Sequence, residues 1–362
     1  MAVVTYKCPN CDGGLVFEPG SQKFTCDYCG SSFTEEEVRA LDPARQSAQA
    51  AGEAREAPDR DRSGQQQEAE PQAMLYSCPS CGAQVVTDDT TAATFCYFCH
   101  NPVVLEARLQ GEFAPDQVIP FAVDREKAVQ SFLDWVGKKK FVPRAFFSQD
   151  QIEKLTGVYF PYWMADLDVR GSLNTTGTKV RVWRAGNYEY TETSRFQLVR
   201  DGSFRFPELT RNALNSKYNR QLVDGVLPFR TGELRDFQMS FLSGFQAEQR
   251  NMERGDVEQD VCEEARDYTR KLLQDTAAGY TLVDTSSLQA EVSASDWRYV
   301  LLPVWVLTYK GTGGKTYYYA MNGQTGKVAG RVPVSNAKLA ALFASVWAGV
   351  SALMMLAGAM VW

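Results

Sequence analysis

CPNC at residues 8–11 and CDYC at residues 26–29 form the first of two cysteine frames in this chain, and CPSC at residues 78–81 and CYFC at residues 96–99 form the second. In both frames two residues separate the cysteines of a pair, and fourteen residues separate the two pairs. Thiolates at this spacing on two tight turns can reach one ion and complete a tetrahedron of sulfur ligands. The repeated spacing predicts two small zinc ribbons near the N-terminus.

Each predicted site has four sulfur ligands and no open position, so we expect two structural Zn²⁺ ions per chain. The single histidine, His100, directly follows the last of these cysteines. We interpret it as a turn residue rather than a ligand, because four sulfurs already complete the site and histidine tolerates a left-handed backbone. The predicted ligands are Cys8, Cys11, Cys26 and Cys29 for the first ion, and Cys78, Cys81, Cys96 and Cys99 for the second.

The redox environment of the cysteines decides between metal binding and disulfide bonding. Residues 1–7 contain no basic stretch followed by an apolar run, so we expect no secretory signal and a reducing cytoplasmic environment. Disulfide-bonded secretion is the alternative, and it is disfavoured because cytosolic cysteines stay reduced. The remaining cysteine, Cys262, has no cysteine or histidine near it in the sequence, and we interpret it as a structural thiol.

Changes in composition divide the 362-residue chain into segments. Residues 42–73 are mainly Ala, Gln, Glu, Arg, Asp and Pro, and this composition cannot offset the entropy cost of ordering, so we predict a disordered linker. We therefore expect the two ribbons to be tethered rather than rigidly packed. The predicted segments are zinc ribbon 1 (residues 1–41), the linker (42–73), zinc ribbon 2 (74–107), an α+β body (108–336) and a transmembrane anchor (337–362).

The body has the pattern of a helix followed by an antiparallel meander. Asp124 is placed to cap a helix that ends at Gly137. Residues 138–140, all lysine, follow it as a solvated helix end or, alternatively, as a phosphate contact. Alternating strands come next, with turns expected at residues 184–187 and 201–202.

A weaker pattern indicates two related units within the body. Residues 118–121 (VIPF) are similar to 226–229 (VLPF), and residues 160–163 (FPYW) are similar to 302–305 (LPVW). Two divergent α+β units are one interpretation, and chance similarity between apolar strands is the alternative. A second helix is predicted over residues 257–276. Its apolar face is predicted to contain Val261, Ala265, Tyr268 and Leu272.

The C-terminal 24 residues, Leu339–Trp362, contain no charged residue. As a helix they would be about 36 Å long, enough to cross a hydrocarbon core of about 30 Å. Arg331 and Lys338 precede this stretch, so we expect a single-pass protein of the cell membrane with its N-terminal bulk in the cytoplasm. After Asp296 every charged residue is basic, which suits an anionic lipid surface. The predicted fold class is α+β, with two zinc ribbons, an antiparallel body and one transmembrane helix.

The charge balance argues against nucleic acid as a ligand. The chain has 38 Lys and Arg against 44 Asp and Glu, and residues 76–107 contain no Lys or Arg. Basic contacts to phosphate supply most of the non-specific affinity for nucleic acid, and the ribbons lack them. The sequence also has no Gly-rich phosphate loop and no constellation of Ser, His and Asp. We predict a non-enzymatic protein with no small-molecule substrate, whose ribbons bind other proteins. An enzyme with a polar pocket in the body is the remaining alternative.

Three segments of the body, together with the double ribbon, carry a resemblance to a known family. They are residues 118–121 with the helix after them, 157–163 (GVYFPYW) and 320–327 (AMNGQTGK). With these motifs the chain resembles the bacterial TFIIB-type double-zinc-ribbon membrane proteins of the YdjG-like type. The resemblance implies a cytoplasm-facing adaptor that recruits phage-shock protein A homologues and SPFH/flotillin-like proteins in a membrane-stress response. A zinc-ribbon protein associated with nucleic acid, in transcription or replication, is the alternative.

Overall fold

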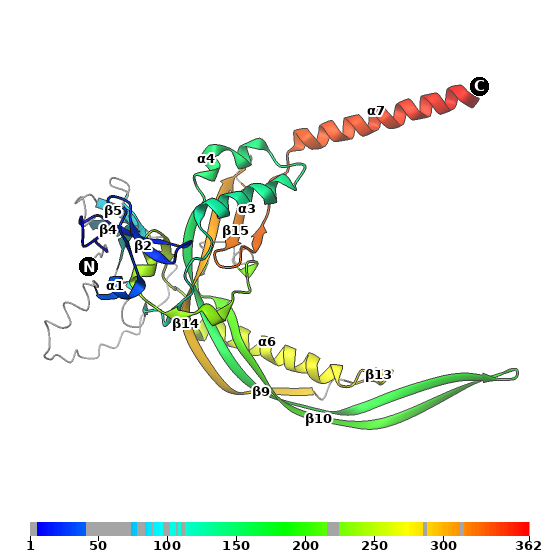
Figure 1. Cartoon of the computed structure of the whole chain (residues 1–362). Helices are drawn as coiled ribbons and strands as arrows, with labels where there is room; N and C mark the ends of the chain where they lie inside the picture. Colours follow the sequence, from blue (N-terminus) through cyan, green and yellow to red (C-terminus); the bar gives the residue numbers. More distant parts are fainter. Residues whose placement is uncertain are drawn as a thin grey trace.

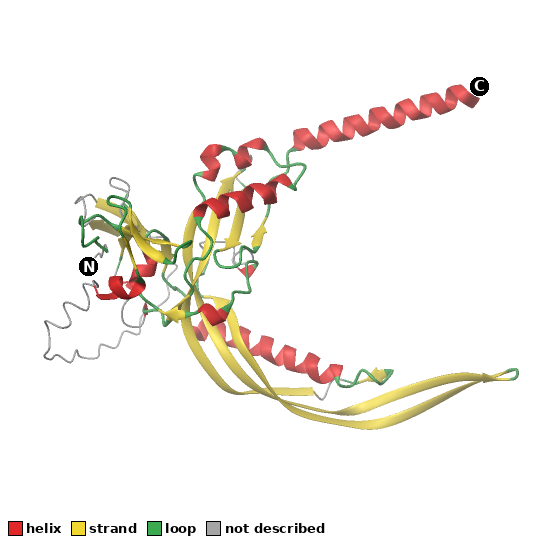
Figure 2. Ribbon diagram, viewed as in Figure 1, coloured by secondary structure: helices red, strands yellow, loops and turns green. Residues whose placement is uncertain are grey.

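The computed structural model describes residues 6–40, 74–77, 84–87, 90–96, 102–105, 108–109, 113–215, 224–284, 288–311 and 315–361. Within these ranges the protein is a mixed α+β structure built on one large sheet, with an N-terminal cysteine cluster and one apolar C-terminal helix (Figure 2). The predicted α+β class is confirmed. Figure 1 shows two long projections from the body, the hairpin of β9 (Thr156–Ala185) with β10 (Tyr188–Asn212), and helix α7 (Asn336–Val361).

The first ribbon is a small antiparallel sheet followed by helix α1 (Glu35–Ala40). The Thr34 N–H donates to Glu37 Oε2 at 2.7 Å, and the Glu37 N–H donates to Thr34 Oγ1 at 3.4 Å. This reciprocal cap satisfies amide groups that the first helical turn leaves free. The three strands, of which β2 pairs with both others, are β1 (Leu15–Glu18), β2 (Lys23–Cys26) and β3 (Ser32–Phe33).

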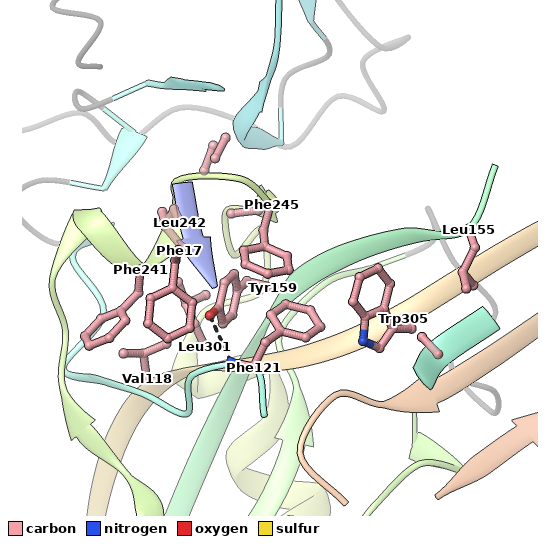
Figure 3. Close-up of a cluster of buried hydrophobic side chains, with 14 of the residues drawn as sticks. Phe17, Val118, Phe121, Leu155, Tyr159, Phe241, Leu242, Phe245, Leu301 and Trp305 are labelled. Carbon is pink, nitrogen blue, oxygen red and sulfur yellow. Dashed lines mark hydrogen bonds between the residues drawn. The ribbon is translucent and has the colours of Figure 1, made fainter. Parts of the chain in front are cut away.

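The first ribbon packs directly against the body. The ring centroids of Phe17 and Phe24 lie 5.5 and 6.2 Å from that of Phe241 (Figure 3). The Phe17 N–H donates to the Ser243 carbonyl at 3.0 Å, and the Ser243 hydroxyl donates to the Leu15 carbonyl. All five residues are buried. The expectation of a freely tethered ribbon is wrong, because its aromatic face is removed from water by the body. The predicted linker lies outside the described residues.

The second ribbon is divided between a small sheet and the large sheet. β4 (Met74–Ser77) and β5 (Gln84–Thr87) form a hairpin of their own. β6 (Thr91–Phe95) and β7 (Pro102–Val104) instead extend the large sheet, because β6 pairs antiparallel with β12 (Gln246–Glu248) of the body. Strands β6 and β7 of this ribbon are therefore also fixed to the body.

β9 and β10 form one long hairpin whose turn lies at residues 186–187, within the predicted range. The turn predicted at residues 201–202 is wrong, because both lie inside β10, opposite Gly171 and Ser172 of β9. Gly171 is needed for helix packing, since a Cβ atom there would lie 2.6 Å from Thr269 Cγ2. Gly171 lets α6 approach the strand closely, and it is not part of a turn.

The body contains the same arrangement of elements twice. Each unit has a short strand, a helix, a long strand and a return strand, and the short strand lies parallel to the long strand of the other unit. Trp163 Nε1 donates to the Met252 carbonyl at 3.0 Å. In the other unit, Trp305 Nε1 donates to the Val123 carbonyl at 3.0 Å. The first unit is β8 (Gln117–Val118), α3 (Arg125–Gly137), β9 and β10, and the second is β12, α6 (Arg254–Asp275), β14 (Leu288–Lys310) and β15 (Thr316–Asn322).

This repeated arrangement agrees with the two-unit interpretation but changes which segments correspond. Residues 160–163 and 302–305 are equivalent, because β9 and β14 pair antiparallel around them. Residues 226–229 are not the counterpart of 118–121, since residues 247–250 occupy that place. The 226–229 segment instead packs against the apolar side chains of β9 and β14 in a separate cluster. Its sequence similarity reflects a shared buried environment.

The helices bury equivalent stripes against the sheet. Tyr268 and Leu272, predicted on the apolar face of α6, are 39% and 44% exposed, so that part of the prediction is wrong. The stripe advances by four residues at each step, which keeps it over the slightly twisted sheet. The buried residues are Ala128, Phe132 and Val136 in α3, and Val257, Val261, Ala265, Thr269 and Leu273 in α6.

Candidate functional site

The first cysteine frame is built by two similar turns. The Asp12 N–H donates to the Cys8 carbonyl at 2.8 Å. The Gly30 N–H donates to the Cys26 carbonyl, also at 2.8 Å. Asp12 and Gly30 both have a left-handed backbone, with φ of 64° and 71°, a conformation that glycine and aspartate adopt more readily than most residues. Each turn thereby folds its two cysteines toward the same point.

The four sulfur atoms of this frame lie within 4.8 Å of one another. Cys8 Sγ is 3.6 Å from Cys29 Sγ, and Cys11 Sγ is 3.4 Å from Cys26 Sγ. A tetrahedral ion with Zn–S bonds of about 2.3 Å requires sulfur separations of about 3.8 Å, so the cluster fits one Zn²⁺. All four are free thiols rather than disulfides. The predicted ligands of the first ion are therefore brought together.

Local hydrogen bonds shift the pKa values of Cys11 and Cys29 in opposite directions. The Ser31 hydroxyl, 3.2 Å from Cys29 Sγ, and the Ser31 N–H lower the pKa of Cys29 to about 6. The Gly13 N–H lowers the pKa of Cys11, but hydrogen bonds with Cys26 and Cys29 outweigh it and raise that pKa to about 12. Cys29 therefore ionises more readily than Cys11.

A bound Zn²⁺ would link the two turns through Cys8, Cys11, Cys26 and Cys29. Binding of structural zinc contributes about 10–16 kcal/mol to the folding of small zinc domains. With four sulfur ligands the ion would have no open position for a substrate. This set of four sulfur ligands is therefore typical of a structural zinc site rather than a catalytic one.

The second cysteine frame is only partly described. Cys96 is buried and directly follows β6. Cys78, Cys81, Cys99 and His100 lie outside the described residues. The second Zn²⁺ therefore stays a prediction from spacing.

Helix α7 leaves the body, and no other described part of the chain covers it (Figure 1). Residues Asn336–Met355 are long enough and apolar enough to cross a membrane, and none of this stretch is buried. Phe343, Trp347 and Leu353 are among its exposed side chains. A soluble core helix of the same composition would be buried, so the exposure separates α7 from that class.

The distal part of the β9–β10 hairpin carries a surface that the sequence interpretation missed. Trp183 and Tyr190 stack at 5.6 Å between ring centroids with an interplanar angle of 14°, and they are 41% and 45% exposed. The Arg181 guanidinium lies 5.6 Å from the Trp183 ring centroid, and Lys179 Nζ lies 5.0 Å from that of Tyr280. In the sequence, this surface could have been recognised from Lys179, Arg181 and Trp183, which alternate along one face of the strand.

The three segments that carry the family resemblance meet around Phe121, which lies beside Tyr159 in Figure 3 and close to Gly323. Its ring stacks on Phe245 at 4.1 Å and meets the edges of Tyr159 and Trp305 at 5.0 and 5.2 Å. A Cβ atom on Gly323 would lie 2.6 Å from the Phe121 ring, so only glycine fits there. These motifs therefore build the core of the body rather than a reactive site.

Taken together, the fold and the cysteine cluster define a class: an α+β protein with an N-terminal four-cysteine metal site and a C-terminal helix able to span a membrane. The chain is 32% identical over 347 residues to the uncharacterized protein YdjG of Bacillus subtilis (strain 168), and the alignment covers 96% of this chain and 95% of YdjG. The chain belongs to the YdjG family. No family model matches it, and no solved structure matches it.

Proposed function

We propose that this protein is a single-pass, zinc-binding scaffold of the cell membrane that faces the cytoplasm and recruits partner proteins in a membrane-stress response, without catalytic activity. The observation that carries the proposal is α7. Residues Asn336–Met355 are fully exposed, and an apolar surface of this length needs lipid or protein around it. The absence of charge after Lys338 supports insertion, and the basic residues before it support a cytoplasmic body.

The β9–β10 hairpin supports the recruiting role. The first ribbon and strands β6 and β7 of the second pack against the body, whereas the hairpin projects from it (Figure 1). A two-stranded ribbon is only marginally stable by itself, and this one exposes the aromatic pair Trp183 and Tyr190. We therefore place the partner contact on the hairpin rather than on the ribbons. Phage-shock protein A homologues and SPFH/flotillin-like proteins are the partners that the family resemblance implies.

Extraction of cell membranes with alkaline carbonate tests the anchor. Wild-type protein is expected to stay in the pellet. Val350→Arg places a charge near the middle of α7, at a cost of about 2.5–3.5 kcal/mol, and should move the protein toward the supernatant. Val350→Leu is the matched control and should behave as wild type. Recovery of the wild-type full chain in the soluble fraction would refute the proposed membrane anchor.

A further inference from the structure

The end of α3 and the start of α7 are joined, although about two hundred residues separate them in the chain. The Ser335 N–H donates to the Phe141 carbonyl at 2.7 Å. Lys338 Nζ donates to the Val142 carbonyl at 2.8 Å. Figure 1 shows the last turn of α3 beside the point where α7 leaves the body. The residues that follow α3 are therefore held at the foot of the apolar helix.

Those residues are three consecutive lysines, 138–140, and all three are exposed. Within the described ranges none of them forms a salt bridge. Lys338 Nζ donates to a carbonyl oxygen, and Lys338 forms no salt bridge with any acid among the described residues. The foot of α7 thus combines four cations from two distant segments in a chain whose overall charge is −6.

A helix-end role explains only part of this surface. One cation near the last carbonyls complements the helix dipole, and the benefit falls off within a turn. Lys139 Nζ also lies 5.7 Å from the ring centroid of Trp135, and paired Trp and Lys side chains are typical of the membrane–water interface. If α7 crosses the bilayer, the lysines at its start lie at the level of the lipid phosphates.

We propose that Lys138, Lys139, Lys140 and Lys338 form a binding surface for anionic lipid headgroups at the foot of α7. The inference rests on the proposed membrane anchor and adds a lipid preference to it. Each cation near an anionic surface contributes about 1 kcal/mol, which corresponds to about a fivefold change in the bound-to-free ratio of the foot. Bound headgroups hold the body against the membrane, because the segment 138–142 belongs to the body.

Hydrogen–deuterium exchange on the full chain in lipid nanodiscs tests the proposal. One set of discs contains phosphatidylcholine alone, and the other contains phosphatidylcholine with phosphatidylglycerol. Exchange across residues 135–142 is expected to slow several-fold in the anionic discs only, and high salt should remove the difference because it screens exposed charges. The variant K138Q/K139Q/K140Q should show no lipid dependence. K179Q/R181Q/R195Q makes the same charge change on the hairpin and should retain it.

Exchange across α6 reports whether each variant stays folded, and the salt series on wild type tests the proposal without any variant. Equal exchange in both lipids, with the protein firmly inserted, overturns the lipid surface while leaving the anchor intact. Failure to enter either disc overturns the anchor itself. Protection by phosphatidylglycerol that survives in K138Q/K139Q/K140Q assigns the effect to other residues and also refutes the proposal.

Discussion

Asn322, at the end of β15, is a buried polar side chain whose removal should strongly destabilise the body. It is fully buried. Its amide nitrogen donates to the carbonyls of Val226 and Pro228 at 3.0 and 3.3 Å. Its Oδ1 accepts from the N–H groups of Gln324 and Thr325 at 2.9 and 2.8 Å. One side chain therefore fixes both the turn after β15 and the segment that covers the other face of the sheet.

Asn322→Ala removes four hydrogen bonds, of which those with Val226 and Gln324 are buried and those with Pro228 and Thr325 are partly buried. A typical intramolecular hydrogen bond contributes about 0.5–1.5 kcal/mol net, so the loss should be about 4 kcal/mol. Asn212 occupies the equivalent position at the end of β10. It accepts from the Leu214 N–H at 2.7 Å and bonds to the Tyr162 side chain. Asn212→Ala should therefore cost about half as much, about 2 kcal/mol.

Urea unfolding of the detergent-solubilised full chain, followed by circular dichroism, measures both variants. With a slope of about 3 kcal/mol per molar urea, Asn322→Ala should lower the midpoint by about 1–1.5 M. Gln130→Ala, which removes an exposed bond to Asp134, is the control and should leave the midpoint within about 0.2 M. A smaller shift in the urea midpoint for Asn322→Ala than for Asn212→Ala would refute the reasoning. The number of hydrogen bonds that each asparagine side chain makes would then not determine the loss of stability.

Three further results are expected. Metal analysis of the full chain should give two zinc ions, and Cys8→Ser should remove the first while leaving the second; a wild-type chain with no zinc contradicts the assignment. Phe241→Ala should cost about 3–5 kcal/mol and raise protease sensitivity within residues 6–40, since Phe241 covers Phe17 and Phe24; an unchanged cleavage pattern would mean that the ribbon is not held by this contact. Trp183→Ala with Tyr190→Ala should abolish co-purification of partners from native membranes without changing the urea midpoint, whereas Val182→Ala with Thr191→Ala, on the opposite face of the same hairpin, should retain them; equal capture by both variants removes the hairpin from the contact.

Local signals in the sequence predicted the parts of the molecule that depend on neighbours in the chain. The spacing of Cys8, Cys11, Cys26 and Cys29 places four sulfurs together because each pair needs only its own turn. The Asp124 cap is equally local, since Asp124 Oδ1 accepts from the Lys127 N–H at 2.8 Å.

Features that depend on distant partners were not predictable in the same way. Asp201 and Gly202 have the composition of a turn, yet they stay in β10 because β9 supplies hydrogen-bond partners along its whole length. The buried face of α6 differs from the predicted one, because contact with the sheet decides which residues of a helix are buried. Docking of the first ribbon depends on Phe241, more than two hundred residues from Phe17, and no periodicity reports such a pair.

The exchange of short strands between the two units has a consequence for how the protein is made. β8 pairs with β14 and with the two-residue strand β11 (Arg235–Asp236), and β9 pairs with β14 from Thr156 to Leu173. A nascent chain that has not reached residue 288 therefore exposes an open sheet edge, which favours pairing with other chains. The body closes only after β14 and β15 have left the ribosome, and α7 follows β15 closely along the chain. Folding of the body and delivery of its apolar helix to the membrane are thus late events, close together in time.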